Sequence, residues 1–432
     1  MEARSWHRHY DFFVPRSIRY PEIPVADLLQ FAASTNPDKT ALNFYGTKTT
    51  FAQLRQQVLK MASALANLGI GKGDRIGLHM PNCPQYIISY YAGLSLGAII
   101  VNINPLYTAN ELKEIARQTN LSLLFTFDLA LKQVRELCRD IAISHVIVTR
   151  ISDFIDGLPV STPEEICGSD PGWGHFSVIL EGSSDIKLPR IEIGPQDPAL
   201  IQFTGGTTGI PKGAVLTHAN IIASVVANTM WGDYILQAKD PDIRNVLVVL
   251  PYFHLFGNIL CLNWGIYTCS TQIILPRFDI EEVMTTLAGA KGIGFFPAVP
   301  TMINAIINHP KAADLNLGKK LTQISSAAAP MPQEMIYKLK EMGVFYSEGW
   351  GMTETTSMGT SLPLMGRKKV GSIGIPAPDT DIRLVDVEDG VTIVPRGTPG
   401  EILIKGPTVM KEYWNNPEET ANHLKDGWLH TG

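Results

Sequence analysis

Helical and strand periodicities alternate along residues 50–125, and this alternation limits the possible folds more than any other feature of the sequence. Apolar side chains recur on one helical face from Phe51 to Leu68, Thr49 or Thr50 can cap its start, and Gly69 ends it. Downstream, short apolar strands follow each helical stretch, with strands near 76–80, 98–103 and 121–125 and helices over 84–96 and from 109. This order predicts an α/β fold whose mainly parallel sheet is covered by helices on both faces.

The chain has 432 residues, more than the roughly 250–300 at which a single hydrophobic core stops growing. Residues 151–196 are rich in Gly, Pro, Ser and Asp, and we interpret them as a connection to a second α/β half. Beyond about residue 360 the pattern changes to short strands between Gly and Pro turns, at 381–386, 391–394 and 401–405. We therefore expect two packed α/β sheet subdomains and a small β-barrel-like subdomain, near 1–196, 197–359 and 360–432.

Charge and cysteine usage exclude several classes of protein. The net charge is −5 and no long Lys/Arg block occurs, so we expect no nucleic-acid partner. The five cysteines are scattered without metal-ligand spacing, and the N-terminus lacks the apolar core of a signal peptide, which together favour a reducing cytoplasm. The aromatic N-terminus, residues 6–13, is expected to pack on the protein's own core, with contact at the inner face of a membrane as the alternative.

Two long uncharged stretches need a separate interpretation. They cover residues 83–110 and 245–276 and are long enough for a membrane span. Gly97 divides the first, while Pro251, His254 and two asparagines interrupt the second. We predict a buried strand and a buried helix in each rather than a membrane span.

A loop rich in glycine and threonine carries the strongest chemical signal. Residues 203–213 read Phe-Thr-Gly-Gly-Thr-Thr-Gly-Ile-Pro-Lys-Gly and follow the apolar run 199–202. Glycines let backbone N–H groups converge on an anion, threonine hydroxyls add donors, and Lys212 adds a mobile charge. The spacing fails the Walker pattern, because no Gly-Lys pair stands at the required offset. We interpret the segment as a polyphosphate-binding loop of another kind.

The same loop resembles the signature of the adenylate-forming superfamily, which includes acyl-CoA synthetases, luciferases and peptide-synthetase adenylation domains. Further segments that resemble the superfamily's motifs follow in the expected order, so the resemblance covers nearly the whole chain. The sequences of residues 204–209, 101–107 and 427–432 most resemble the corresponding sequences of bacterial long-chain fatty-acid CoA ligases. These further segments are 216–220, 250–254, 326–330, 348–354, 400–407 and 426–432.

The resemblance implies an ATP-dependent ligase that converts a fatty acid to acyl-AMP and then to acyl-CoA. It implies that Lys212, His254, Thr353 and Glu354 serve catalysis, and that Thr204 and Glu354 hold Mg2+, a cation that prefers oxygen ligands. Trp350 stands where the family usually has Tyr, and an indole can still stack on adenine. The implied ATP and AMP contacts are Thr204, Gly205, Gly206, Thr207, Thr208, Gly209, Lys212, Ala328, Ala329, Pro330, Glu348, Gly349, Trp350, Gly351, Met352 and Thr353.

The implied acyl site is less specific. A single histidine in an apolar run is usually a structural core residue, but His254 follows Pro251-Tyr252-Phe253 at the family's substrate-proximal position. The resemblance therefore places it at the junction of acyl group and AMP. The further residues that it implies around the acyl chain are Gly257, Asn258, Ser326, Ala327 and Gly351. Chain length, and alkyl against aryl preference, cannot be derived from these positions.

The end of the chain leads to a further expectation. In the family an Asp that binds the ribose, a hinge and a small mobile domain follow the position of Gly432, and that domain supplies a lysine and CoA-binding surfaces. We therefore expect a large N-terminal part that binds AMP or acyl-AMP weakly and forms little acyl-CoA alone. An aryl- or medium-chain acyl-CoA ligase, a fatty-acyl-AMP ligase and a non-catalytic nucleotide-binding module remain open, as does the oligomeric state, a homodimer included.

Overall fold

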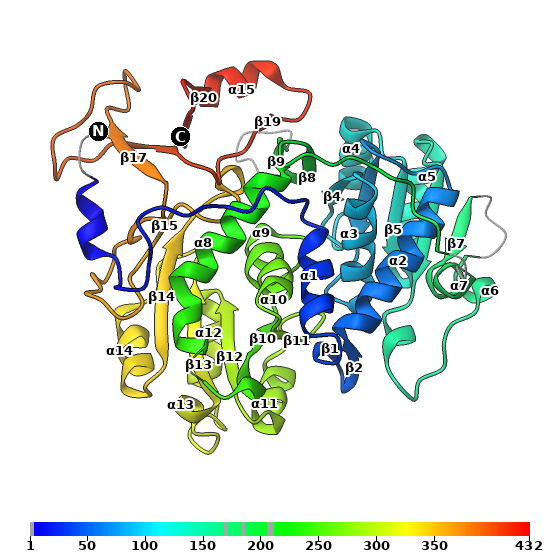
Figure 1. The fold of residues 1–432 in the computed structure, drawn as a ribbon, viewed down its shortest axis with the longest axis horizontal. Helices are drawn as coiled ribbons and strands as arrows, with labels where there is room; N and C mark the ends of the chain where they lie inside the picture. Colours follow the sequence, from blue (N-terminus) through cyan, green and yellow to red (C-terminus); the bar gives the residue numbers. More distant parts are fainter. Residues whose placement is uncertain (1–3, 168–171, 183–185, 205–210, 238) are drawn as a thin grey trace. The chain divides into compact units, whose positions relative to one another are not determined.

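The computed structural model describes residues 4–167, 172–182, 186–204, 211–237 and 239–432 (Figure 1). The chain divides into two compact units. We call residues 22–203 and 245–283 the first unit, and residues 1–21, 204–244 and 284–432 the second unit. Both units combine helices with strands, so the predicted α/β class is confirmed.

Parallel strands dominate the first unit. Strands β8, β4, β3, β5, β6 and β7 are neighbours in that order, and each pair is parallel. Strands β10, β11, β1 and β2 form a second series, in which only β1 and β2 pair antiparallel. Their bounds are β1 Thr40–Phe44, β2 Thr47–Thr50, β3 Arg75–His79, β4 Ile99–Asn102, β5 Leu123–Phe127, β6 His145–Thr149, β7 Trp173–His175, β8 Pro198–Phe203, β10 Asn245–Val248 and β11 Thr271–Ile274.

The three helices predicted to start at Phe51, residue 84 and residue 109 begin at those residues, as α2, α3 and α4. In α2, Thr50 accepts a hydrogen bond from the backbone of Gln53 while the Gln53 side chain accepts one from Thr50, a complete capping box. Figure 1 shows α2 alongside α3. The helix bounds are α1 Asp27–Thr35, α2 Phe51–Asn67, α3 Pro84–Ser95, α4 Ala109–Thr119, α5 Leu131–Asp140, α6 Pro163–Ile166, α7 Phe176–Gly182, α9 Leu255–Gly257 and α10 Trp264–Tyr267, with a π-helix over Asn258–Asn263.

The two long uncharged stretches are buried core segments, as predicted. The first forms α3 and β4, and the second forms β10, the helical turns from Leu255 to Tyr267, and β11. Each stretch contains a buried hydrogen bond between its own side chains: Tyr86 donates to Asn102 at 2.6 Å and Tyr252 donates to Gln272 at 2.7 Å. Across the described ranges, no helix is both long and apolar enough to cross a membrane.

In the second unit a parallel core continues into antiparallel edges. Strands β12, β13 and β14 are parallel, and β15 and β16 extend β14 in antiparallel sense. Helix α8 lies against this sheet (Figure 1), with the backbone of Gly232 close to the Gln323 side chain. The bounds are β9 Gly213–Thr217, α8 His218–Gln237, β12 Ile293–Ala298, α12 Pro300–Ile307, α13 Leu317–Lys320, β13 Leu321–Ser326, α14 Gln333–Glu341, β14 Phe345–Trp350, β15 Thr360–Ser361 and β16 Ile375–Pro376; α11 Ile280–Gly289 connects the units.

The β-rich C-terminal region differs from the prediction in two respects. Strands β17 Asp381–Val385, β18 Glu401–Lys405, β21 Trp428–His430 and β20 Leu424–Lys425 form an open antiparallel sheet in that order, not a closed barrel. The strand predicted at 391–394 is only a single bridge between Val385 and Ile393. The reason is local: Asp389 accepts hydrogen bonds from the backbone of Val391 and Thr392, which makes a turn there instead of a strand.

The N-terminal segment of the second unit packs on α8 and on residues 364–381, as expected for most of its aromatic residues. Tyr10 donates to Pro376 O at 2.8 Å and its ring meets Trp231 edge to face, while Phe13 stacks on Tyr234. Phe12, by contrast, is 78% exposed.

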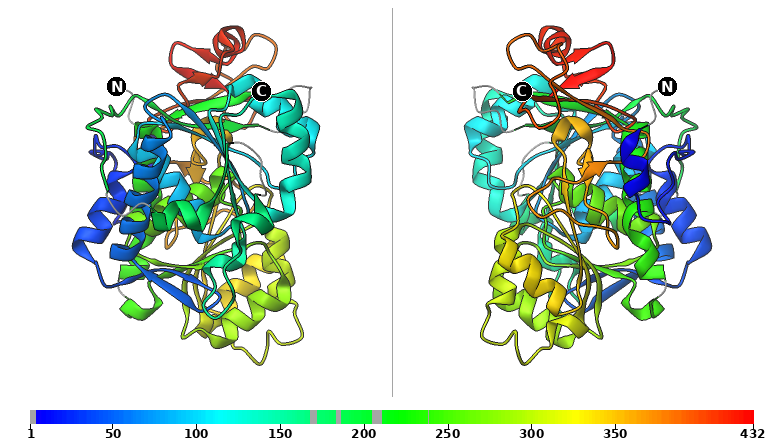
Figure 2. Two further views of the ribbon diagram at one scale, coloured as in Figure 1. Left: turned by 90° about the vertical axis from the view of Figure 1, so that its right-hand side faces the viewer. Right: turned by 90° about the vertical axis from the view of Figure 1, so that its left-hand side faces the viewer.

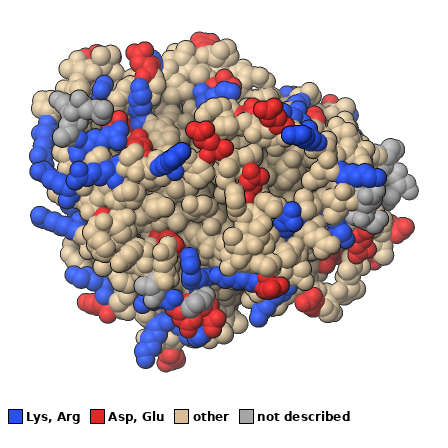
Figure 3. All heavy atoms as spheres, in the orientation of Figure 1, with Lys and Arg blue, Asp and Glu red and all other residues tan. Residues whose placement is uncertain are grey.

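Figure 3 shows Lys and Arg side chains interspersed with Asp and Glu over the face that it draws.

Asp11 links this segment to the rest of its unit through three backbone hydrogen bonds. The buried carboxylate accepts backbone hydrogen bonds from Leu364 at 2.6 Å, Met365 at 3.1 Å and Gly366 at 2.6 Å. Asp11→Ala should lower the free energy of unfolding by about 3 kcal/mol, because it leaves donors to a charged acceptor unpaired. Urea titration measures this change. Exposed Asp38→Ala is the control, and equal midpoints for the two variants would contradict the prediction.

Candidate nucleotide site

The phosphate loop is closed at its base by two hydrogen bonds. The backbone N–H of Thr204 donates to Lys212 O at 2.9 Å, and Thr204 Oγ1 donates to the same carbonyl at 3.4 Å. The two ends of the loop are therefore adjacent, as a cradle for an anion requires. Gly205, Gly206, Thr207, Thr208 and Gly209 lie outside the described residues.

A short strand from the C-terminal region lies beside the loop. β19 (Glu412–Tyr413) pairs antiparallel with β9, which begins directly after Lys212, and Tyr413 is opposite Ala214. This pairing brings Tyr413 under Lys212, whose Nζ lies 5.4 Å from the centre of the Tyr413 ring. A cation over an aromatic face is attracted by the ring quadrupole.

Glu354 meets the same tyrosine from another element. It lies in a single 3₁₀ turn (Thr353–Thr355) after β14, and its side chain is buried, with 5% exposure. Tyr413 Oη donates to Glu354 Oε1 at 2.8 Å, and Glu354 O accepts from the backbone of Met410 at 2.8 Å. Burial raises the pKa of Tyr413, and Glu354 raises it further, so the phenol stays protonated and remains a donor. Lys212 and Glu354 thus both contact Tyr413.

The donor set fits a magnesium ion held partly by substrate phosphates. Glu354 supplies a carboxylate and Thr204 a hydroxyl, both hard oxygen ligands, and Mg2+ commonly binds through one or two carboxylates plus phosphate oxygens. In the part of the chain that the structure describes, no group of three or more His, Cys, Asp or Glu side chains forms a metal site by itself. A Mg2+ ion bound through Glu354 and Thr204 would take further oxygen ligands from the nucleotide phosphates and water.

Residues with strained backbone follow the two neighbouring strands β13 and β14. Ser326 and Glu348 are aligned at the carboxyl ends of β13 and β14. After them, Ala328 has φ of 72°, Thr356 47° and Ser357 69°, all in the left-handed region. Such conformations cost about 1–3 kcal/mol each and cluster at functional sites. The predicted adenine residues 328–330 follow β13 here and are exposed to solvent.

The residues after β13 and on β14 have distinct environments. The Glu348 carboxylate accepts from Met331 N at 3.1 Å and from Tyr346 Oη at 2.9 Å, so it ties the strained turn to β14. Trp350 packs one edge against Gly359. A Cβ at Gly351 would lie 2.4 Å from Ser357 O, so only glycine fits there. Of the other predicted residues, Ala327, Gly349, Met352 and Thr353 are half-buried in this region of the second unit.

The predicted acyl residues His254, Gly257 and Asn258 belong to the first unit. His254 caps α9: its Nδ1 accepts from Phe256 N at 3.3 Å, which leaves the proton of a neutral ring on Nε2. The ring is reached by solvent, yet surrounding protein atoms displace enough water to lower its pKa. A Cβ added at Gly257 would lie only 2.3 Å from Pro251 O, so the backbone packs closely there. Asn258 is fully buried, and its Oδ1 accepts a hydrogen bond from Asn263 Nδ2 at 2.9 Å.

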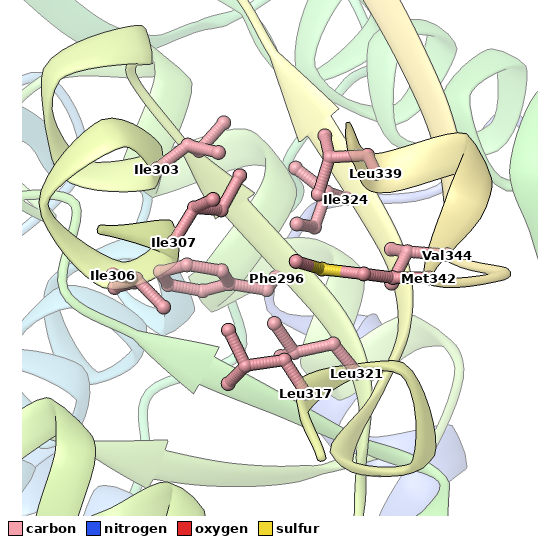
Figure 4. A pocket seen from close by; sticks show the side chains of 10 residues that line it. All are labelled: Phe296, Ile303, Ile306, Ile307, Leu317, Leu321, Ile324, Leu339, Met342 and Val344. Carbon is pink, nitrogen blue, oxygen red and sulfur yellow. The ribbon is translucent and has the colours of Figure 1, made fainter. Parts of the chain in front are cut away.

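One cavity in the second unit is unrelated to these residues. Figure 4 shows apolar side chains of α12, β12, β13 and α14 pointing toward one another around it. Its free volume is about 10 Å3, the lower limit for one water molecule. It is a gap in the core rather than a substrate site.

The AMP-binding enzyme family matches residues 29–414. This chain belongs to that family. The family assignment therefore agrees with the resemblance carried by the phosphate loop, and it extends over most of both units of this AMP-binding enzyme.

Curated relatives of this AMP-binding enzyme include ligases for two kinds of acid. The long-chain-fatty-acid–CoA ligase of Bacillus subtilis is 34% identical over 439 residues, which cover 99% of this chain and 77% of that protein. The 4-coumarate–CoA ligase 4 of Arabidopsis thaliana is 28% identical over 433 residues, covering 98% of this chain and 72% of that protein.

Among solved structures, the inhibitor-bound N-terminal domain of FACL13 from Mycobacterium tuberculosis superimposes with a TM-score of 0.79 at 25% identity, covering 95% of each chain. The long-chain-fatty-acid–CoA ligase FadD1 from Archaeoglobus fulgidus gives a TM-score of 0.82 at 24% identity, covering 98% of this chain and 83% of that one. The fold of this AMP-binding enzyme is therefore that of known adenylate-forming enzymes.

Sequence reasoning missed Tyr413 and Glu419, the residues that contact Lys212 and Glu354. A local signal was present for the helix that carries Glu419: Asn416 caps it, Pro417 is its first residue, and Glu418 and Glu419 fill its first turn. No local signal links these residues to the loop, because Lys212 and Glu419 are 207 positions apart.

Proposed function

We propose that this AMP-binding enzyme activates a long-chain fatty acid with ATP and then transfers the acyl group to CoA. The coarser description, an AMP-forming acid–thiol ligase, follows from its family. The single observation that supports the proposed site is that Lys212 and Glu354 both contact Tyr413. A cation for phosphate and a carboxylate for Mg2+ are thus paired in one place, as the chemistry of a triphosphate requires.

The proposed reaction has two displacements. A carboxylate oxygen of the fatty acid attacks the α-phosphorus of ATP, and the bond to pyrophosphate breaks. The CoA thiolate then attacks the acyl carbonyl, and AMP leaves with the electrons of the broken carbon–oxygen bond. Adenylation is needed because a free carboxylate is a poor electrophile, and the protein contributes by aligning the reacting atoms and neutralising charge.

The central predicted residues have proposed roles in this scheme. Lys212 and Thr204 hold the β- and γ-phosphates, Glu354 with Thr204 would hold Mg2+ against them, and Thr353 contacts the α-phosphate. Trp350 and residues 328–330 receive adenine. A neutral His254, with Gly257 and Asn258, lines the acyl group, for which an uncharged ring is suited because it does not pull the carboxylate away from phosphorus.

Two alternatives are weaker. Aryl or medium-chain acids as substrates are supported by the similarity to a 4-coumarate ligase, but the fatty-acid ligase of Bacillus subtilis is more similar, at 34% against 28% identity. A non-catalytic nucleotide-binding module would not need both charged groups. Their joint presence at Tyr413 supports a working site. The subdomain boundaries predicted near residues 196 and 359 and a cytoplasmic location remain part of the proposal.

A carboxylate panel tests the substrate. Fatty acids of increasing length, 4-coumarate and benzoate are each incubated with the protein, ATP, Mg2+ and CoA, and pyrophosphate and thioester are both quantified. We expect pyrophosphate release to be fastest with long-chain acids and at least tenfold slower with 4-coumarate. A faster reaction with the aryl acids would contradict the proposed substrate and favour the aryl alternative. Reactions without carboxylate give the background hydrolysis of ATP.

A further inference from the structure

The ammonium of Lys212 already has an anionic partner in the protein. Glu419 of α15 (Pro417–His423) accepts a hydrogen bond from Lys212 Nζ in a direct ion pair. The contact lowers the pKa of Glu419, so its carboxylate is ionised at neutral pH. Both side chains are about 30% exposed, at 27% and 32%, so water and solutes can reach the pair.

Glu419 is held in place by contacts that do not involve Lys212. Its backbone N–H donates to Asn416 Oδ1 at 3.1 Å, and Thr420 Oγ1 accepts from Tyr413 N at 2.9 Å. These bonds attach the start of α15 to β19, the strand that pairs with β9 beside the phosphate loop. In both views of Figure 2, α15 lies with the β20–β21 hairpin. The backbone that carries Glu419 is therefore held beside the loop even when Lys212 turns away.

A polyphosphate and Glu419 would compete for the same cation. Lys212 is proposed to bind the β- and γ-phosphates, and a carboxylate fixed next to that position would repel them if it were not displaced. His423 Nδ1 lies 3.5 Å from the Glu419 carboxylate and offers a neighbouring polar group once the lysine has left. AMP has neither a β- nor a γ-phosphate, so it would not enter this competition.

Resting on the proposed function, we propose that Glu419 is an exchangeable counter-ion of Lys212 that sets the affinity of the site for ATP and pyrophosphate. In the absence of nucleotide, the Glu419 carboxylate forms an ion pair with the Lys212 ammonium. Binding of ATP moves Lys212 from Glu419 to phosphate, and Glu419 recovers the lysine when pyrophosphate departs. Glu419 thus weakens the binding of both ATP and pyrophosphate. It favours the release of pyrophosphate at some cost in affinity for ATP.

The test compares Glu419→Gln with the parent by calorimetric titration of three ligands: ATP with Mg2+, pyrophosphate with Mg2+, and AMP. Gln keeps the shape but removes the competing charge. We expect ATP and pyrophosphate to bind about two- to fivefold more tightly, since exposed ion pairs are weak, and AMP to bind as in the parent. Glu419→Asp keeps the charge and should bind the polyphosphates more like the parent than Glu419→Gln does.

A matched control distinguishes the loss of the ion pair from the loss of a negative charge on α15. Glu418→Gln removes the same charge from the same helix at an exposed neighbouring position, and it should leave all three affinities unchanged. Weaker or unaltered pyrophosphate binding by Glu419→Gln, or equal tightening by Glu418→Gln, would overturn the inference. If the parent bound no ATP, the proposed function would fail and the inference with it. If the parent bound ATP but activated no carboxylate, only the proposed function would fail.

Discussion

Replacing Lys212 or Glu354 with Ala is expected to lower carboxylate-dependent pyrophosphate release about 100- to 1,000-fold, the usual cost of removing one preorganised charge-stabilising group. The Lys212 ammonium lies over the Tyr413 ring, and the Glu354 carboxylate accepts a hydrogen bond from the hydroxyl of the same tyrosine. Each loss leaves phosphate or metal charge without its partner. The measurements are pyrophosphate release and calorimetric binding of ATP with Mg2+.

The controls for these variants lie next to Tyr413, the residue that both charged groups contact. Lys411→Ala and Glu412→Gln change exposed residues beside Tyr413, and they should retain the activity of the parent. Thermal unfolding of every variant shows whether a loss of activity reflects a loss of fold. Parent-like binding and turnover by both Lys212→Ala and Glu354→Ala would show that the site has been assigned to the wrong residues.

The second large effect is acid sensitivity caused by one buried histidine. His79 at the end of β3 is fully buried, and its Nδ1 lies 3.0 Å from Thr126 Oγ1. Burial lowers its pKa from 6.5 to about 4. Because the folded state then takes up the proton less readily than the unfolded state, stability is full above pH 6.5 and falls as pH decreases toward 4. A difference of this size in pKa corresponds to about 3 kcal/mol.

The free energy of unfolding of the parent and of His79→Gln should be measured by urea titration between pH 7.5 and about 4. We expect the parent to lose about 3 kcal/mol more than the variant over this range, whatever their difference at pH 7.5. His9→Gln, which changes an exposed histidine, should follow the parent. Parallel pH curves for the parent and His79→Gln would show that His79 is not the group responsible.

The α/β fold was predictable because its signals are local. The capping box of Thr50 and Gln53, the apolar helical face that begins at Phe51, and the β-branched run of β4 each act over a few residues. The same reasoning was wrong at residues 391–394, where Val391 and Ile393 look like strand residues. There the hydrogen bonds to Asp389 set a turn, and both side chains remain largely exposed, at 77% and 63%.

The candidate site was predictable only in part, for a related reason. Lys212 and Thr204 stand within one loop, so sequence spacing alone indicates a phosphate site there. The strained turn at Ala328 gives no such signal, because alanine has no preference for positive φ and the conformation depends on surrounding contacts. The predicted nucleotide role of Glu348 stays a prediction, while its carboxylate is seen to bind Met331 and Tyr346.

The sequence by itself determined the class of fold and the family, since these depend on periodicity, capping and residue types within short windows. It also predicts, for the same reason, that residues 203–213 bind phosphate. Only the tertiary structure decided which groups meet Lys212 and Glu354. Tyr413 and Glu419 reach them through the pairing of β19 with β9 and the start of α15, across 207 positions of chain in the case of Glu419. Contacts over such separations depend on the packing of whole elements, which no local pattern encodes.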